Sequence, residues 1–182
     1  MPPERNLART YHLDANRVNA RQGLHDMNQL EVWHANDVIT LEMSVVAQQE
    51  SASGAISRRN KAYGYVNTST LASTESERQI LLRIEGILCP FGNPSQSVRN
   101  DAEIAFNARK YMAALITADG ASSRQPGGLL GHRQELAELG ITVLRDSEAV
   151  AEIRDLIDRR DEAARRYSEI NGIPLPNWVG RD

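Results

Sequence analysis

Short apolar runs alternate with longer segments of helical periodicity along most of this chain. In 24–35, for example, apolar residues recur at three-residue steps, which indicates an amphipathic helix. Strands separated by helices are typical of a mostly parallel sheet with helices on both faces. We therefore predict an α/β fold, a three-layer α/β/α sandwich with a mostly parallel central sheet. Its predicted strands are 9–13, 38–41, 113–117 and 141–144.

Residues with capping chemistry mark several predicted helices. Ser44 can cap a helix that carries Glu50 and ends before Gly54. Thr74 and Glu77 form a capping box ahead of an apolar stripe that ends at Pro90. The remaining predicted helices are a short segment near 16–21, then 98–112, 132–139 and a last one opened by Asp146. Residues 55–73 are predicted as a helix followed by a loop.

A length of 182 residues suits one α/β domain with a terminal extension. We predict a domain over 1–146, with a C-terminal helix and irregular tail over 147–182 packed on it or extending from it. No apolar stretch is long enough for a membrane helix, and the N-terminus lacks the apolar core of a signal peptide. The single cysteine, Cys89, excludes an internal disulfide framework and a cysteine-rich zinc site. We expect a cytoplasmic protein.

The charge balance disfavours a passive nucleic-acid-binding module. The net charge is -3 and the isoelectric point is about 5.8, whereas such modules usually carry a basic domain. A nuclease is compatible with an acidic chain, because metal-binding carboxylates lower the isoelectric point while the bound cations restore local positive charge.

Four acidic residues occur where a parallel sheet would bring them together. Asp14 directly follows the first predicted strand, and Asp119 follows the strand at 113–117. Glu50 and Asp101 lie on helices, about two turns into one and in the first turn of the other. Ligands of such sheets bind outside the carboxyl ends of the strands. We therefore expect the four carboxylates at one rim, where a hard cation such as Mg²⁺ or Mn²⁺ would relieve their repulsion.

The chain resembles the PIN-domain nucleases, including their VapC-like toxins, over roughly residues 8–146. The first motif resembles Leu13-Asp14-Ala15-Asn16, an Asp followed two places later by Asn. The second resembles the segment from Ser44 to Glu50 with Gly54 four places on. The third resembles Asn100-Asp101-Ala102, and the fourth resembles Thr117-Ala118-Asp119 at the end of a buried strand. The chain departs from the family after Asp119, where Gly120-Ala121-Ser122-Ser123-Arg124 replaces the usual apolar or aromatic residue.

The resemblance implies a PIN-like fold and hydrolysis of RNA, less often DNA, with Mg²⁺ or Mn²⁺. It assigns Asp14 and Asp119 as the most direct metal ligands. Glu50 and Asp101 would complete the ligand set or orient the water, and Asn16 and Thr117 would orient the ligands. Because family members include toxins that often dimerise, the resemblance also implies a homodimer and an antitoxin-like protein partner.

Other interpretations of these acids stay open. Asp101 can be a helix cap, and Asp119 before Gly120 can form a simple turn. Glu42, in or just after the second strand, is the main rival of Glu50 as the second acid. Asp146 can be a fifth acid at the same rim, although an N-cap role is favoured.

The basic residues Arg58, Arg59, Lys61 and Arg124 are candidates for phosphate contacts, with a solvated surface cluster slightly favoured. The four histidines have no metal-ligand spacing. Two rival functions remain: a non-catalytic PIN-like scaffold that binds RNA or protein, and a phosphohydrolase acting on small phosphate esters.

Overall fold

The computed structural model describes residues 3–68, 71–90, 92–120 and 127–182. Within these residues, five strands form one sheet in the order β3-β2-β1-β4-β5, and each neighbouring pair is parallel. The predicted α/β fold with a parallel central sheet is confirmed. The strands are β1 (Thr10–Leu13), β2 (Thr40–Ser44), β3 (Val66–Thr68), β4 (Ala114–Ile116) and β5 (Val143–Leu144).

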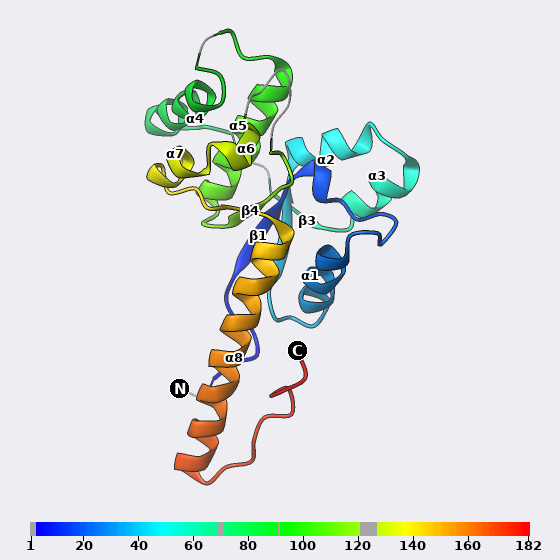
Figure 1. The fold of residues 1–182 in the computed structure, drawn as a ribbon, viewed down its shortest axis with the longest axis vertical. Helices are drawn as coiled ribbons and strands as arrows, with labels where there is room; N and C mark the ends of the chain where they lie inside the picture. The colour runs from blue at the N-terminus through cyan, green and yellow to red at the C-terminus, as the bar shows by residue number, and fades with distance from the viewer. Residues whose placement is uncertain (1–2, 69–70, 91, 121–126) are drawn as a thin grey trace.

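The helices alternate with these strands along the chain (Figure 1). A single 3-10 turn and α1 follow β1, α2 and α3 follow β2, and α4 and α5 lead from β3 to β4. The short helices α6 and α7 precede β5. In chain order the helices are η1 (Ala15–Arg17), α1 (His25–Ala35), α2 (Val45–Ala52), α3 (Ile56–Ala62), α4 (Glu75–Leu88), α5 (Gln96–Lys110), α6 (Gly128–Gly131), α7 (Arg133–Glu138) and α8 (Asp146–Asn171).

Successive residues of β1 show that helices cover both faces of the sheet. The Tyr11 hydroxyl donates to Glu152 of α8 at 3.1 Å. The next residue, His12, points to the opposite face, where its ring lies 5.7 Å from the Tyr111 ring at the end of α5. Helix α1 packs against α8, and α5 contacts β2 and β4 with α4 packed on its outer side. The chain is therefore a three-layer α/β/α sandwich.

Several element boundaries differ from the sequence prediction, and three of the differences have a local cause. Strand β3 lies in a segment predicted as helix and loop; it is a three-residue edge strand, and Val66 in it is 51% exposed, so no buried run marked it. Strand β2 was predicted from residue 38 but begins at Thr40. The backbone of Val38 is outside the ladder, because its carbonyl accepts the Leu7 N–H and its N–H donates to the Trp33 carbonyl. Helix α5 begins at Gln96, since the Ser95 hydroxyl accepts the Val98 N–H.

The C-terminal segment returns along α8 toward the N-terminus (Figure 1). Helix α8 ends at Gly172, which adopts a left-handed conformation. Residues beyond Gly172 fold back onto Arg160 of α8: the Trp178 ring lies 4.5 Å from its guanidinium, and Asp182 accepts a hydrogen bond from it. Arg160 also donates to its neighbour Asp161. We call Arg5, Arg160, Asp161 and Asp182 the tail cluster. No helix in the described part of the chain is long and apolar enough to cross a membrane.

Candidate functional site

The four predicted acids line one pocket of about 360 Å³, which we call the carboxylate pocket. It opens at the carboxyl ends of β1 and β4. These strands are neighbours, with Leu13 paired to Ile116, so Asp14 and Thr117 leave the sheet side by side. The Asp14 N–H extends the ladder by donating to the Ile116 carbonyl at 3.0 Å. The pocket is lined by Asp14, Ala15, Asn16, Glu50, Arg58, Ser97, Asp101 and Asp119.

Asp14 is the most buried of the four acids, with 3% of its surface exposed. It precedes η1 but makes no side-chain capping bond, so helix capping does not account for it. Burial raises the pKa of Asp14 above its ordinary value. A hydrogen bond from Thr117 opposes this rise, whereas the negative charges of Glu50 and Asp119 add to it. The fold therefore holds a carboxylate in a place that disfavours its charge.

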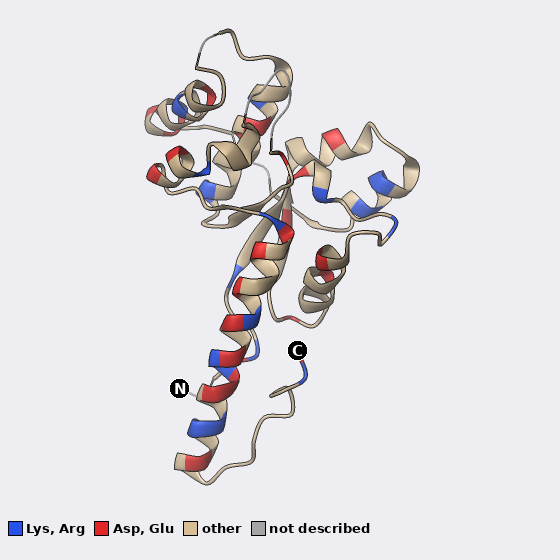
Figure 2. Ribbon diagram, in the orientation of Figure 1, with Lys and Arg blue, Asp and Glu red and all other residues tan. Residues whose placement is uncertain are grey.

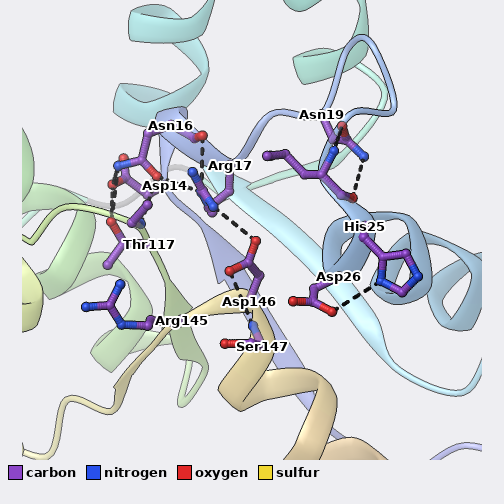
Figure 3. A network of polar contacts seen from close by, with 12 residues as sticks. Asp14, Asn16, Arg17, Asn19, His25, Asp26, Thr117, Arg145, Asp146 and Ser147 are labelled. Carbon is purple, nitrogen blue, oxygen red and sulfur yellow. Dashed lines mark hydrogen bonds and ion pairs between the residues drawn. The ribbon is translucent and has the colours of Figure 1, made fainter.

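Two neutral side chains hold the Asp14 carboxylate (Figure 3). The Thr117 hydroxyl donates to Asp14 Oδ2 at 2.5 Å, and the Asn16 amide donates to the same oxygen at 2.6 Å. Thr117 Oγ1 also accepts the Asp119 N–H at 2.9 Å. Asn16 Oδ1 accepts the Ala118 N–H at 3.1 Å. Asn16 and Thr117 thus join the segment after β1 to the segment after β4 and orient both acids.

Asp119 is held by the backbone at the start of α6. The Leu129 N–H donates to Asp119 Oδ2 at 2.9 Å, and the Leu130 N–H donates to the Asp119 carbonyl. Gly128 lies directly against this carboxylate: a Cβ there would lie 2.4 Å from Asp119 Oδ2. Its φ of +53° is also in the left-handed region that favours glycine. The site therefore requires glycine at this position.

Glu50 and Asp101 reach the pocket from α2 and α5, which contact each other. The Asn100 amide donates to Glu50 Oε1 at 2.6 Å and so ties the two helices at the pocket wall. The sequence analysis placed Asp101 in the first turn of its helix. This is wrong, because α5 begins at Gln96 and Asp101 is in its second turn. Since Ser95 caps α5, the capping interpretation of Asp101 is wrong.

Glu42, the rival of Glu50, and Asp146, the candidate fifth acid, both lie outside the residues that line the carboxylate pocket. Glu42 is within β2 and pairs with His12 at 3.0 Å. Asp146 is the first residue of α8, with Arg145 in the capping position, so the favoured N-cap interpretation of Asp146 is wrong. Its carboxylate pairs with Arg17 at 3.0 Å (Figure 3). Of the two candidates for the second acid, Glu50 is the one at the pocket.

The predicted basic residues separate in space. Arg58 lines the pocket and its Nη2 donates to the Ala15 carbonyl at 2.6 Å. Arg59 is exposed on α3 and is not among the residues that line the pocket. Lys61 instead pairs with Glu31 at 2.8 Å and lies over the Tyr65 ring. Arg124 lies outside the described residues.

Several residues at the site carried no assigned role in the sequence analysis. Helical spacing places Ser97 about one turn before Asp101 on the same face of α5, so Ser97 could have been found from the sequence. Asn100 directly precedes Asp101 and lies on an adjacent face, so its bond to Glu50 follows from the packing of α5 on α2. Gly128 and Leu129 gave no such signal. Their role depends on how the segment after Asp119 returns to that residue.

The donor set suits a hard cation, because carboxylate oxygens are the ligands that Mg²⁺ and Mn²⁺ prefer. A cation would also relieve the buried charge of Asp14. As the side chains stand, no three His, Cys, Asp or Glu residues in the described ranges are arranged to hold an ion among them. Mg²⁺ commonly keeps several waters and takes one or two carboxylates directly, so the residues fit a partly hydrated ion.

Neither a protein-family model nor a curated protein matches the sequence. Among solved structures, this chain is similar to a chain in the crystal structure of VapBC2 from Rickettsia felis bound to a DNA fragment from their promoter. The alignment covers 75% of this chain and 98% of that chain, with 14% sequence identity and a TM-score of 0.46. At this identity and TM-score, the likeness does not establish a family for this chain.

Proposed function

We propose that this protein is a metal-dependent nuclease that hydrolyses phosphodiester bonds, with RNA as its substrate. The observation that supports the proposal is one pocket lined by four carboxylates, in which the buried Asp14 is held by neutral donors. A buried charge without a cationic partner is costly, so its presence at the carboxyl edge of a parallel sheet favours a bound cation.

In this proposal, Asp14 and Asp119 hold one or two divalent ions. When bound, such an ion polarises a phosphoryl oxygen, lowers the pKa of the attacking water and stabilises the leaving oxygen. Thr117 contacts both acids, through the Asp14 carboxylate and the Asp119 N–H, and keeps their spacing. Glu50 and Asp101 accept hydrogen bonds from the attacking water and orient it toward phosphorus.

Arg58 supplies positive charge at the same pocket. Its guanidinium bonds to the Ala15 carbonyl, which keeps it at the wall that Asp14 and Asn16 share. A guanidinium has five donors in a planar fork, so one bond to a carbonyl does not exhaust it. In the proposed reaction Arg58 binds a non-bridging phosphate oxygen and so opposes the repulsion between the phosphate and the four acids.

The choice of RNA over DNA, the toxin-type role, a homodimer and an antitoxin-like partner are proposals that rest on the sequence resemblance alone. A cleavage assay with single-stranded RNA and DNA in Mn²⁺, Mg²⁺ and EDTA tests the reaction and the substrate together. We expect cleavage of RNA that requires the cation and is lost in EDTA.

Glu50→Gln and Glu42→Gln form a matched pair for this assay. Both remove one negative charge from a partly exposed glutamate, but only Glu50 lines the pocket, whereas Glu42 pairs with His12. We expect Glu50→Gln to lower the cleavage rate by about a hundredfold or more and Glu42→Gln to leave it within about twofold. Equal losses in both variants would contradict the site.

The second candidate function is a non-catalytic scaffold that binds RNA or protein. The signature of such a scaffold would be missing acids, whereas all four predicted acids line the carboxylate pocket, so the site favours the nuclease. Thermal unfolding with and without Mn²⁺ separates the two: a nuclease is stabilised by the ion according to its affinity, and a scaffold is not.

A further inference from the structure

A second pocket, of about 370 Å³, adjoins the carboxylate pocket. Its walls come from the segment between η1 and α1 and from the start of α3, which lie close together in Figure 1. Most of the wall is apolar, and two arginines stand in its lining. The residues that matter here are Val18, Ala20, Leu24, Ala55, Arg21 and Arg58. We call this the apolar pocket.

The wall between η1 and α1 is held by a buried asparagine. Asn19 is 3% exposed, and its amide donates to Asn28 Oδ1 at 2.7 Å and to the Leu24 carbonyl at 3.3 Å. Its own carbonyl oxygen accepts the Leu24 N–H at 3.1 Å. These bonds close the loop on itself, so the apolar pocket is formed before any ligand binds.

Arg58 lines both pockets. Its bond to the Ala15 carbonyl places the guanidinium at their boundary. Basic residues also lie along α3 and the segment after β1 in Figure 2. A ligand that fills both pockets would therefore present an anionic group near Arg58 and a flat apolar group beyond it.

We propose that the apolar pocket binds one unpaired base of a single-stranded nucleic acid, next to the phosphate held at the carboxylate pocket. A base has apolar faces that stack on aliphatic walls and on arginine, and its backbone carries the negative charge that Arg21 and Arg58 complement. A base within a duplex cannot enter such a pocket. The proposal rests on the proposed function and adds a subsite for one base beside the phosphate.

Binding in EDTA tests this subsite without any cleavage. The probe is a fluorescein-labelled oligouridylate of about eight residues, compared by anisotropy with an abasic ribose-phosphate strand of equal length and with an RNA duplex, all at one salt concentration. We expect the oligouridylate to bind about tenfold more tightly than the abasic strand and the duplex.

Two variants fill the apolar pocket from opposite walls. Gly23 is exposed, has no left-handed φ and would have no atom within 4 Å of an added Cβ, so Gly23→Phe introduces bulk without backbone strain. Ala55→Phe does the same from the start of α3. The matched control is Gly86→Phe on α4, where an added Cβ also meets nothing within 4 Å. Thermal unfolding confirms that each variant is folded.

We expect both filling variants to bind the oligouridylate as weakly as the abasic strand, and Gly86→Phe to keep the tenfold difference. Equal affinity of the wild-type protein for the two strands, unchanged binding in both filling variants, or no binding at all would overturn the base subsite. If the protein cleaves RNA with a cation but binds the oligouridylate and the abasic strand equally, the nuclease proposal holds and the base subsite is refuted. If it binds the oligouridylate more tightly but cleaves nothing, the base subsite holds and the nuclease proposal is refuted.

Discussion

The carboxylate pocket and the tail cluster both bury acidic groups, but they compensate the charge differently. In the tail cluster, Arg160 and Asp161 are both less than 10% exposed and are paired at 2.7 Å. Arg160 and Arg5 also hold Asp182, at 3.0 Å and 2.5 Å. In the carboxylate pocket, the described bonds to Asp14, Glu50 and Asp119 come from neutral donors.

The two pKa shifts follow this difference. Burial acts to raise the pKa of Asp182, yet hydrogen bonds from Arg5 and Arg160 bring it below its ordinary value. Burial raises the pKa of Asp14, and neighbouring acids raise it further. A charge cluster that serves the fold is neutralised within the chain. A cluster with an excess of negative charge, such as the carboxylate pocket, stabilises the fold less and is suited to bind a cation from solution.

The largest expected effect is that of Asp14→Asn on cleavage. Held cations contribute several kcal/mol to transition-state stabilisation, so removing this ligand should lower the rate by about a thousandfold. Without metal, the same variant should unfold roughly 2–4 °C higher, because a buried charge and its repulsion are removed. Differential scanning calorimetry in EDTA measures the second effect.

Asp155→Asn, on the exposed surface of α8, is the control for both readouts and should change neither. If Asp14→Asn cleaved RNA at the wild-type rate, or unfolded at a lower temperature than the wild type in EDTA, the proposed difference between the carboxylate pocket and the tail cluster would be wrong.

The second prediction concerns the tail cluster. Arg160→Met leaves Asp161 and Asp182 without their buried cation, which should destabilise the fold by about 3–5 kcal/mol. Cleavage by the folded variant should not change. Arg159→Met, next along α8, breaks only an exposed pair with Asp155 and should cost less than about 1 kcal/mol. Urea unfolding of both variants is the measurement, and equal midpoints would show that the tail cluster does not stabilise the fold.

The third prediction concerns the glycine beside Asp119. Gly128→Ala would push against Asp119 Oδ2, so cleavage should fall by about ten- to a hundredfold through misplacement of that carboxylate. Gly172→Ala is the matched control: its φ of +59° carries a similar strain, but an added Cβ meets nothing within 4 Å. The left-handed φ should cost both variants about 1 kcal/mol of stability, and Gly128→Ala should lose more because its Cβ also meets Asp119. If both kept the wild-type cleavage rate, the assigned position of Asp119 would be wrong.

The smallest effect is the opposite pH dependence of the two regions in EDTA. Because the pKa of Asp14 is raised on folding, its contribution to stability is present below its unfolded pKa and is lost as the pH rises through the folded pKa. The stability gained in Asp14→Asn should therefore grow as the pH rises from about 4, and then level off.

The pKa of Asp182 is lowered, so its contribution is present above the unfolded pKa and is lost as the pH falls through the folded value. The stability lost in Asp182→Asn should accordingly shrink as the pH falls below about 4. Melting temperatures of Asp14→Asn, Asp182→Asn and the wild type between about pH 3 and 8 test both trends. As the pH rises, Asp14→Asn should become more stable relative to the wild type and Asp182→Asn less stable; the same trend in both variants would refute the comparison.

The sequence by itself determined the alternation of strands and helices, most helix starts and the acids at the strand ends. These depend on local rules: Ser44 and Thr74 cap helices through bonds to residues three positions on, and a buried strand is recognised from its own few residues. Asp14 was predicted from its position directly after a strand, whereas the roles of Asn16 and Thr117 beside it were implied by the resemblance to the PIN-domain nucleases. Parallel neighbours then bring the strand ends together.

Only the tertiary structure decided between Glu50 and Glu42 and showed which basic residue reaches the pocket. Glu50 is selected over Glu42 by the contact of α2 with α5, and its bond to Asn100 spans 50 positions. Arg58 reaches the pocket whereas Lys61, three residues later, faces Glu31. Such bonds depend on how whole elements pack, which no spacing along the chain encodes. A local pattern can therefore name the chemistry of this site but not its full set of neighbours.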